Sequence, residues 1–315
     1  MTVLSLDYET KSKVDLIASG LHTYARDPST RVLMAAYAID NGEVQLWQPH
    51  LNPKAPAVLR DAMRDPAVTK RAWNAPFESE MTEHTLGLKV ANWRDTMVSA
   101  LYASLPGKLE FAGPALGLPE EMCKMPEGKR LIRKFSMPKA DGTFRDWKSD
   151  EDDWELFCDY CKRDVTVERE IARRLSSIPV PDAQWALWDL DQRINRRGLP
   201  VDLDFVRKAI AMGAEEKTRF IHMLKRDTGL TNPMTQAGFL GWARDHGYPY
   251  SNLQKGTVAR AIREGEMSDY LVRMMGIRGD AAKTSIRKYD SILAKTQNDR
   301  LYNTVQFYGA SRTGR

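Results

Sequence analysis

Four acidic residues and one tyrosine, placed in three separate segments, have the types and spacing of a site that binds divalent metal ions. Asp7 and Glu9 lie at the end of the first apolar run, Glu78 follows near the middle of the first half, and Tyr160 and Asp164 come later. Residues two apart on a strand point to the same side. Residues four apart on a helix are neighbours. Each pair is therefore predicted to share one face of its element.

Carboxylates gathered in this way are costly unless cations neutralise them. Ligands that are all oxygen atoms favour Mg²⁺ or Mn²⁺ over zinc. Two such ions, roughly 4 Å apart, can activate a water molecule and stabilise the departing oxygen of an in-line displacement. Each short pattern is common by itself, but their ordered combination is not. The sequence thus predicts phosphodiester cleavage with two divalent cations, Mg²⁺ first and Mn²⁺ as a substitute.

The first half of the chain contains the strands and helices expected to position these residues. Apolar or alternating runs predict strands over residues 3–6, 31–39, 43–48 and 68–73, and Asn41-Gly42 is a hairpin signal. Helical patterns follow over residues 55–64, from Pro76 onward, and over 95–103, 109–116 and 152–175. Strands followed by alternating helices indicate an α/β layer built on a mixed sheet.

The second half is predicted to be almost wholly helical. A break over residues 176–181 ends in Pro-Val-Pro, and helical patterns follow over residues 182–197, 204–227, 235–246 and 268–295. Glycines just past three of these patterns are typical helix stops. We therefore expect one domain over residues 1–178 and a second, helical one over residues 179–315.

Composition and charge are those of a globular protein with a partner that carries negative charge. The chain has 315 residues, 42% hydrophobic and 28% charged, with a formal net charge of +5. Residues 277–315 contain eight basic and three acidic residues, and residues 124–148 contain the same numbers. Such clusters are typical of phosphate-binding surfaces, although solvated helices and loops are the plainer interpretation. No apolar stretch is long enough for a bilayer span. Three cysteines and no leader peptide favour the cytoplasm.

Other patterns in the sequence have a structural explanation. Cys158 and Cys161 form a Cys-x-x-Cys, but no second ligand pair accompanies them. The five histidines lack ligand spacing, and the tryptophans are expected to pack in cores rather than to stack on bases.

The three acidic segments resemble the three motifs of proofreading 3′–5′ exonucleases with a ribonuclease H-like fold whose third motif carries a tyrosine. More narrowly, the chain resembles phage and bacterial family A DNA polymerases. The segments that carry this resemblance beyond the acidic residues are Asn74-Ala-Pro-Phe77, Trp93-Arg-Asp95-Thr96-Met97, Leu109, Ala115-Leu-Gly-Leu118, Asp191 to Asp202, Asn232-Pro-Met-Thr-Gln236 and Tyr308 to Arg315. The resemblance implies a ribonuclease H-like mixed-sheet exonuclease domain followed by a mostly α-helical, thumb-like segment.

The resemblance also implies a role for each residue of the site. Asp7 would bridge both metal ions, Glu9 and Asp164 would complete the site of the ion that carries the attacking water, and Glu78 would act on the second ion. Tyr160 would orient the water, and the products would be single 5′-nucleotides from a DNA 3′ end. Residues expected to contact the single-stranded 3′ end or the primer-template duplex are Thr10, Asn74, Phe77, Lys283, Arg287, Arg312 and Arg315.

Two departures from the family pattern qualify this expectation. The second motif usually ends in Asp, and Glu78 extends the carboxylate by one C–C bond, about 1.5 Å. The chain also ends before any palm or fingers motif of a polymerase, so we expect those parts in a full-length protein and no nucleotide addition by this chain.

Two alternatives remain open at this point. An RNA 3′-exonuclease of the ribonuclease D type has the same acids and tyrosine. A DNA-binding module whose exonuclease site has decayed would retain salt-sensitive DNA binding and release no nucleotides.

Overall fold

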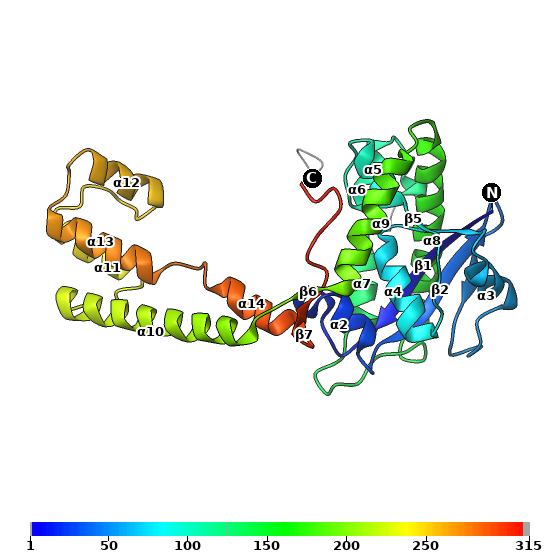
Figure 1. The fold of residues 1–315 in the computed structure, drawn as a ribbon, viewed down its shortest axis with the longest axis horizontal. Coiled ribbons are helices and arrows are strands. Elements are labelled where there is room, and N and C mark those ends of the chain that lie inside the picture. Colours follow the sequence, from blue (N-terminus) through cyan, green and yellow to red (C-terminus); the bar gives the residue numbers. More distant parts are fainter. Residues whose placement is uncertain (1, 124, 311–315) are drawn as a thin grey trace. The chain divides into compact units, whose positions relative to one another are not determined.

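A computed structural model describes residues 2–123 and 125–310 of the chain. Two compact units are present among these residues, one formed by those up to Leu199 together with those from Arg300 to residue 310, and the other by residues 200–299. Figure 1 shows the elements of each unit. The units do not separate at the expected position near residue 179, because helix α9 (Asp182–Arg197) buries Trp188 in the core of the first unit. The division of the chain into functional domains over residues 1–178 and 179–315 remains a prediction.

The first unit is built on a five-stranded mixed sheet with the strand order β3-β2-β1-β4-β5. Its strands are β1 (Val3–Lys11), β2 (Arg31–Ile39), β3 (Gln45–Trp47), β4 (Thr69–Ala72) and β5 (Trp93–Asp95). β2 runs antiparallel to β1 and β3, whereas β4 is parallel to β1 and β5 is parallel to β4. This mixed topology with flanking helices is the ribonuclease H-like fold expected from the sequence.

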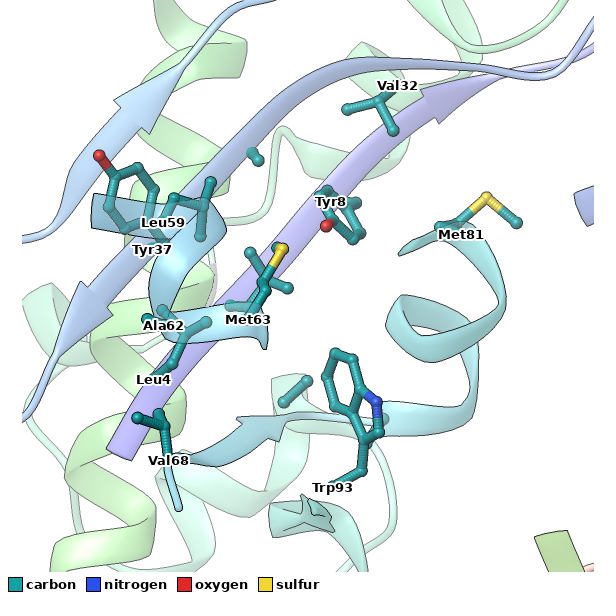
Figure 2. Close-up of a cluster of buried hydrophobic side chains, with 14 of the residues drawn as sticks. Leu4, Tyr8, Val32, Tyr37, Leu59, Ala62, Met63, Val68, Met81 and Trp93 are labelled. Carbon is teal, nitrogen blue, oxygen red and sulfur yellow. The ribbon is translucent and has the colours of Figure 1, made fainter. Parts of the chain in front are cut away.

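Alternation along β1 explains how the sheet separates a core from a site. Leu4, Leu6 and Tyr8 point to one face and are buried in a cluster with residues of α3 and α4. Figure 2 shows Leu4 and Tyr8 on β1 with Met63 of α3 and Met81 of α4 near the same face. The opposite face of the sheet is covered by α7 and α8, whose apolar residues pack on β2. Asp7 and Glu9 lie at the alternate positions of β1, and so on the side of α8.

Helices of the first unit begin and end at residues suited to those positions. Asp95 and Asp150 accept backbone N–H groups at the N-terminal ends of α5 and α8, and Gly87 ends α4 in the left-handed conformation. The helices are α1 (Leu16–Ser19), α2 (Leu21–Arg26), α3 (Ala57–Arg64), α4 (Ala75–Leu86), α5 (Thr96–Tyr102), α6 (Leu109–Ala115), η1 (Glu120–Met122), α7 (Gly128–Phe135), α8 (Glu151–Arg174), η2 (Leu175–Ser177) and α9.

The second unit is helical and has its own core. Its helices are α10 (Leu203–Thr228), α11 (Gln236–Asp245), α12 (Lys255–Arg263), α13 (Asp269–Ala281) and α14 (Arg287–Lys295). Leu224, Phe239 and Leu271 are fully buried in this core. The prediction of a single helix over residues 268–295 is wrong, because a break in the helix separates α13 from α14. Ile286 lies in that break and packs against Gly213 of α10, where a Cβ atom would come within 2.1 Å of it.

Three two-residue strands, β6 (Leu199–Pro200), β7 (Thr296–Gln297) and β8 (Arg300–Leu301), lie where the chain passes from one unit to the other and back. Nowhere in the described part of the chain is a helix long and apolar enough to cross a bilayer.

Candidate active site

One pocket of about 600 Å³ in the first unit collects the residues predicted for the exonuclease. Acids of all three motifs and the tyrosine line it, together with three of the residues expected to bind the substrate. These residues are Asp7, Glu9, Thr10, Asn74, Phe77, Glu78, Tyr160 and Asp164. Segments that are more than 150 residues apart in the sequence thus meet at one place.

The parallel part of the sheet explains why the first two motifs meet. Parallel strands end at the same edge of a sheet, and loops at that edge commonly form binding sites. Asp7 and Glu9 lie in the second half of β1, and Asn74 and Glu78 follow directly after β4. The pairing of β1 with β2 shifts register between Glu9 and Thr10. Such irregularities re-aim side chains next to functional sites, and Thr10 lines the pocket beside Glu9.

Helix α8 brings the third motif to the acids of β1. Tyr160 and Asp164 lie one turn apart on its buried face, with exposed fractions of 1% and 5%. Cys161, the next residue, places its Sγ 3.6 Å from Asp7 Oδ2. The ring of Tyr160 packs closely against Gly128, the first residue of α7, where a Cβ atom would come within 2.1 Å of Tyr160 Cε2. A side chain at position 128 would therefore displace the tyrosine.

The tyrosine stays protonated in these surroundings. Burial raises the pKa of Tyr160 far above its usual range, and the charges of Asp164, Glu9 and Asp7 raise it further. A hydrogen bond with Asp164 acts in the same direction. At neutral pH the side chain is therefore a hydroxyl, able to donate a hydrogen bond in the pocket.

Glu78 is the most deeply buried acid of the site. It lies in the first turn of α4 with an exposed fraction of 3%, at the end of the helix that favours negative charge. Burial raises its pKa well above the usual range, and the neighbouring charges of Asp7, Asp95 and Glu9 add to this. Within the described residues, its Oε2 atom has no hydrogen-bond partner. A buried carboxylate oxygen without a donor is an atom suited to a cation or to a water bound to one.

As they stand, no three His, Cys, Asp or Glu side chains in the ranges 2–123 and 125–310 are close enough together to hold a metal ion. Four carboxylates nevertheless line the same pocket, and the charges of Asp7 and Glu9 help to raise the pKa of Glu78. Like charges repel at short range, so carboxylates are expected to stand apart until a cation lies between them. The donor set consists of oxygen atoms and fits Mg²⁺ or Mn²⁺.

The loop before α4 is held by a residue whose role sequence reasoning missed. Asn74 adopts the left-handed conformation with φ of 67°, which asparagine tolerates better than most residues. Its backbone N–H donates to Asp95 Oδ1 at 2.9 Å, and the N–H of Met97 donates to the same oxygen at 2.9 Å. Asp95 thus fixes the turn that presents Asn74, Phe77 and Glu78. The Asp-Thr-Met signature was visible in the sequence, but its mechanical role needs the fold.

A partly buried ion pair between the sheet and α8 was also missed. Arg71 of β4 lies with its Nε 2.9 Å from Glu168 Oε1, and Thr96 donates a hydrogen bond to the same oxygen. Glu168 follows Asp164 by four residues on the same face of α8. That spacing, Tyr160-Asp164-Glu168, was the available signal. The pair joins α8 to the sheet and so helps to fix the third motif against the first.

The remaining wall of the pocket is partly apolar. Val14, Ile17, Ile132, Met137 and Pro138 line it, and Ile17 and Met137 are exposed. Exposed apolar side chains at the mouth of an acidic pocket suit the flat face of a nucleobase. Neither periodicity nor motif spacing identified these residues, because they come from loops and from the short helices α1 and α7.

The predicted basic contacts lie outside this pocket. Lys283 and Arg287 belong to the second unit, where Lys283 forms an ion pair with Asp280 at 2.7 Å. Arg312 and Arg315 lie outside the described residues. Within the basic run of residues 124–148, Arg130 and Lys134 form ion pairs with Asp153, and Lys129 pairs with Glu110. Part of that run is therefore neutralised inside the unit.

Comparisons with known proteins agree with the resemblance read from the sequence. The chain is 37% identical over its full length to a DNA polymerase of Bacillus phage SP02 and spans 50% of that protein. It is similar in fold to the POL domain of Pol1 from M. smegmatis, solved with a DNA primer-template and dNTP, with a TM-score of 0.53, 13% identity and coverage of 98% of this chain and 50% of that one.

A more distant likeness is to Escherichia coli RNase D, an exoribonuclease involved in structured RNA processing. The TM-score is 0.38 at 15% identity, over 91% of this chain and 75% of that one. No protein-family model matches the chain. The expected resemblance to phage DNA polymerases is confirmed, and the chain spans half the length of the curated relative it matches.

Proposed function

We propose that this chain, similar throughout to a phage DNA polymerase, contains a metal-dependent 3′–5′ exonuclease that removes 5′-mononucleotides from DNA 3′ ends. The observation that carries the proposal is the meeting of four acids and a tyrosine in one pocket. In a replication enzyme this activity would remove misincorporated nucleotides. The expected primer-template contacts of Lys283 and Arg287 in the helical region, and those of Arg312 and Arg315, belong to the same proposal.

Asp7, Glu9, Glu78 and Asp164 would hold the divalent cations. Bound there, the ions would lower the pKa of a water and neutralise charge on the phosphate that is cleaved. Mg²⁺ is the expected ion and Mn²⁺ a substitute, because all the donors are oxygen atoms.

The other residues of the pocket would position the substrate and the water. The protonated hydroxyl of Tyr160 would donate a hydrogen bond that orients the water, and Glu9 would accept one from it. Phe77 and the apolar wall would contact the terminal base, while Asn74 and Thr10 would supply polar contacts to the sugar and phosphate. Burial of the acids and tyrosine would exclude bulk water from the reacting phosphate.

A direct test uses matched single-stranded DNA and RNA oligonucleotides labelled at the 5′ end, in Mg²⁺ and in Mn²⁺. The proposal predicts ladders that shorten from the 3′ end of the DNA, release of 5′-mononucleotides, and no activity in Asp7→Ala. A strong preference for RNA would favour the ribonuclease D type of enzyme. Salt-sensitive DNA binding without nucleotide release in either metal would favour the decayed module.

A further inference from the structure

The segment that follows the second unit, residues 300–310, is called the return segment here. We propose that two of its residues, Tyr302 and Asn303, are positioning residues for the nuclease pocket and act through helix α2 and the hydroxyl of Tyr24. The inference rests on the proposed function, because it assigns a role to residues that lie far from that pocket in the sequence.

The return segment contacts the first residues of α2. The rings of Tyr302 and His22 are stacked, with centroids 3.4 Å apart and an angle of 5° between the planes. Asn303 Oδ1 accepts the backbone N–H of His22 at 3.1 Å. Burial and the nearby Arg26 lower the pKa of His22 to about 4, so the stacked imidazole is uncharged at neutral pH. An N–H in the first turn of a helix lacks an intrahelical acceptor, and Asn303 supplies one.

The same segment is fixed to α9. Asn195 is buried and forms two hydrogen bonds with Val305, donating to its carbonyl at 2.9 Å and accepting its N–H at 3.0 Å. Gly198, at the end of α9, has φ of 67°, and a Cβ atom there would lie 2.9 Å from the ring of Tyr302. Tyr302 is therefore held from one side by the backbone of Gly198 and presents its ring to His22.

Helix α2 carries the connection into the pocket. Tyr24 is buried, and its hydroxyl forms a hydrogen bond of 2.8 Å with Thr10 Oγ1. Both residues line the pocket, and Thr10 follows Glu9 at the register shift of β1. From the last turn of α2, Arg26 also reaches Glu80 at 2.8 Å, two residues beyond Glu78 on α4. The position of α2 thus affects Thr10, which follows Glu9, and Glu80, which lies two residues beyond Glu78. Glu9 and Glu78 are two of the acids proposed to bind the metal ions.

A helix of six residues depends on such contacts for its position. Isolated helices shorter than about 12 residues are marginal in water, so α2 owes its place to tertiary interactions. Loss of the Tyr302 ring would allow α2 to move, and the Tyr24 hydroxyl would move with it. Since a misplacement of about 1 Å can cost about a hundredfold in rate, a partial displacement should lower kcat more than it raises KM.

The test compares Tyr302→Ala with Tyr302→Phe, which keeps the stacked ring, in nucleotide release from a single-stranded DNA oligonucleotide. Tyr302→Ala should lower kcat by roughly tenfold with KM within twofold, whereas Tyr302→Phe should stay within twofold of the wild type. Asn303→Ala provides a second, milder variant if Tyr302→Ala does not fold. In a double-mutant cycle with Tyr24→Phe, the two losses should be less than additive, because they act through one hydroxyl.

Hydrogen exchange of the amides of α2 separates this inference from the proposed function. Exchange over residues 21–26 should increase in Tyr302→Ala and stay unchanged in Tyr302→Phe. Unchanged exchange in Tyr302→Ala, or fully additive effects in the cycle, would overturn the positioning role while leaving the nuclease intact. A wild-type protein that releases no nucleotides, with exchange altered as expected, would instead refute the nuclease.

Discussion

Gly128→Ala should impair the proposed nuclease through the position of Tyr160. At this site an added methyl group would come within 2.1 Å of Tyr160 Cε2, 2.6 Å of Cζ and 2.8 Å of Cδ2. All three contacts involve one rigid ring that is itself 1% exposed, so the ring must move by about 1.4 Å to restore carbon contacts of about 3.5 Å. The hydroxyl moves with the ring.

Two effects follow, and their sizes can be set from this geometry. Loss of the hydrogen bond from the displaced Tyr160 hydroxyl should lower kcat by up to about tenfold, the effect expected when this hydroxyl is removed altogether. Overpacking of the core around Tyr160 costs about 1–3 kcal/mol. Gly128 is the first residue of α7, so the gain from replacing a glycine in the middle of a helix does not apply. We therefore expect the free energy of unfolding to fall by about 1–3 kcal/mol. Single-turnover nucleotide release and urea denaturation measure the two quantities.

The matched control is Gly241→Ala. Gly241 lies inside α11, and apart from its chain neighbours and the backbone of its own helix, no heavy atom of the described residues lies within 4 Å of the position that its Cβ would take. The same substitution there should leave kcat unchanged and stabilise the protein by about 0.5–1 kcal/mol. Gly128→Ala in a Tyr160→Phe background should cost much less activity than alone, because the hydroxyl is already absent. Wild-type kcat in Gly128→Ala, or an equal loss in the Tyr160→Phe background, would refute the reasoning.

Asp7→Ala and removal of divalent ions with EDTA should each reduce nucleotide release at least about a thousandfold, and added Mg²⁺ or Mn²⁺ should restore the EDTA-treated wild type but not the variant. Tyr160→Phe should lower kcat by about tenfold, the effect of one hydrogen bond to the reacting water; an unchanged rate would remove the tyrosine from the mechanism. The raised pKa of Glu78 means that its burial lowers stability as the pH rises above the unfolded-state value of about 4.3. Glu78→Gln should therefore be more stable than the wild type at pH 8 in metal-free urea titrations while losing activity. Asp95, whose pKa burial raises to about 7, should cause a loss of stability between pH about 4 and 7 that Asp95→Asn lacks; parallel stability profiles of variant and wild type would contradict this assignment.

The sequence alone predicted the elements that carry the acids in part: the first strand was expected over residues 3–6, whereas β1 continues to Lys11 and so carries Asp7 and Glu9. β1 alternates clearly, β2 is a continuous apolar run, and α8 combines a four-residue spacing with an N-terminal aspartate. These are strong local signals, because the period of a strand or a long helix is repeated several times within the element. That the acids would meet in one site was predicted from the ordered combination of the three acidic segments. No single segment predicted it.

Elements without such a repeated signal were missed. α7 has eight residues and begins at a glycine, and α2 has six, so neither provides enough turns for periodicity to be recognised. Both turn out to matter for the pocket, since α7 holds Tyr160 and α2 holds Thr10. Short elements are fixed by their neighbours in space, and those neighbours are not visible in a single sequence.

The sequence predicts a domain boundary at the proline-containing break over residues 176–181, because a mixed pattern of strands and helices changes there to a helical one. The fold instead completes the first unit with α9 and residues 300–310, which return from beyond the second unit. Trp188 fills the core beneath α9, and Tyr302 and Asn303 bind α2. Sequence similarity to the phage polymerase also continues past the break. We therefore expect the proposed nuclease pocket to respond to changes in this segment, because the segment contacts α2 and α2 contacts Thr10. The break near residue 179 lies within the first compact unit.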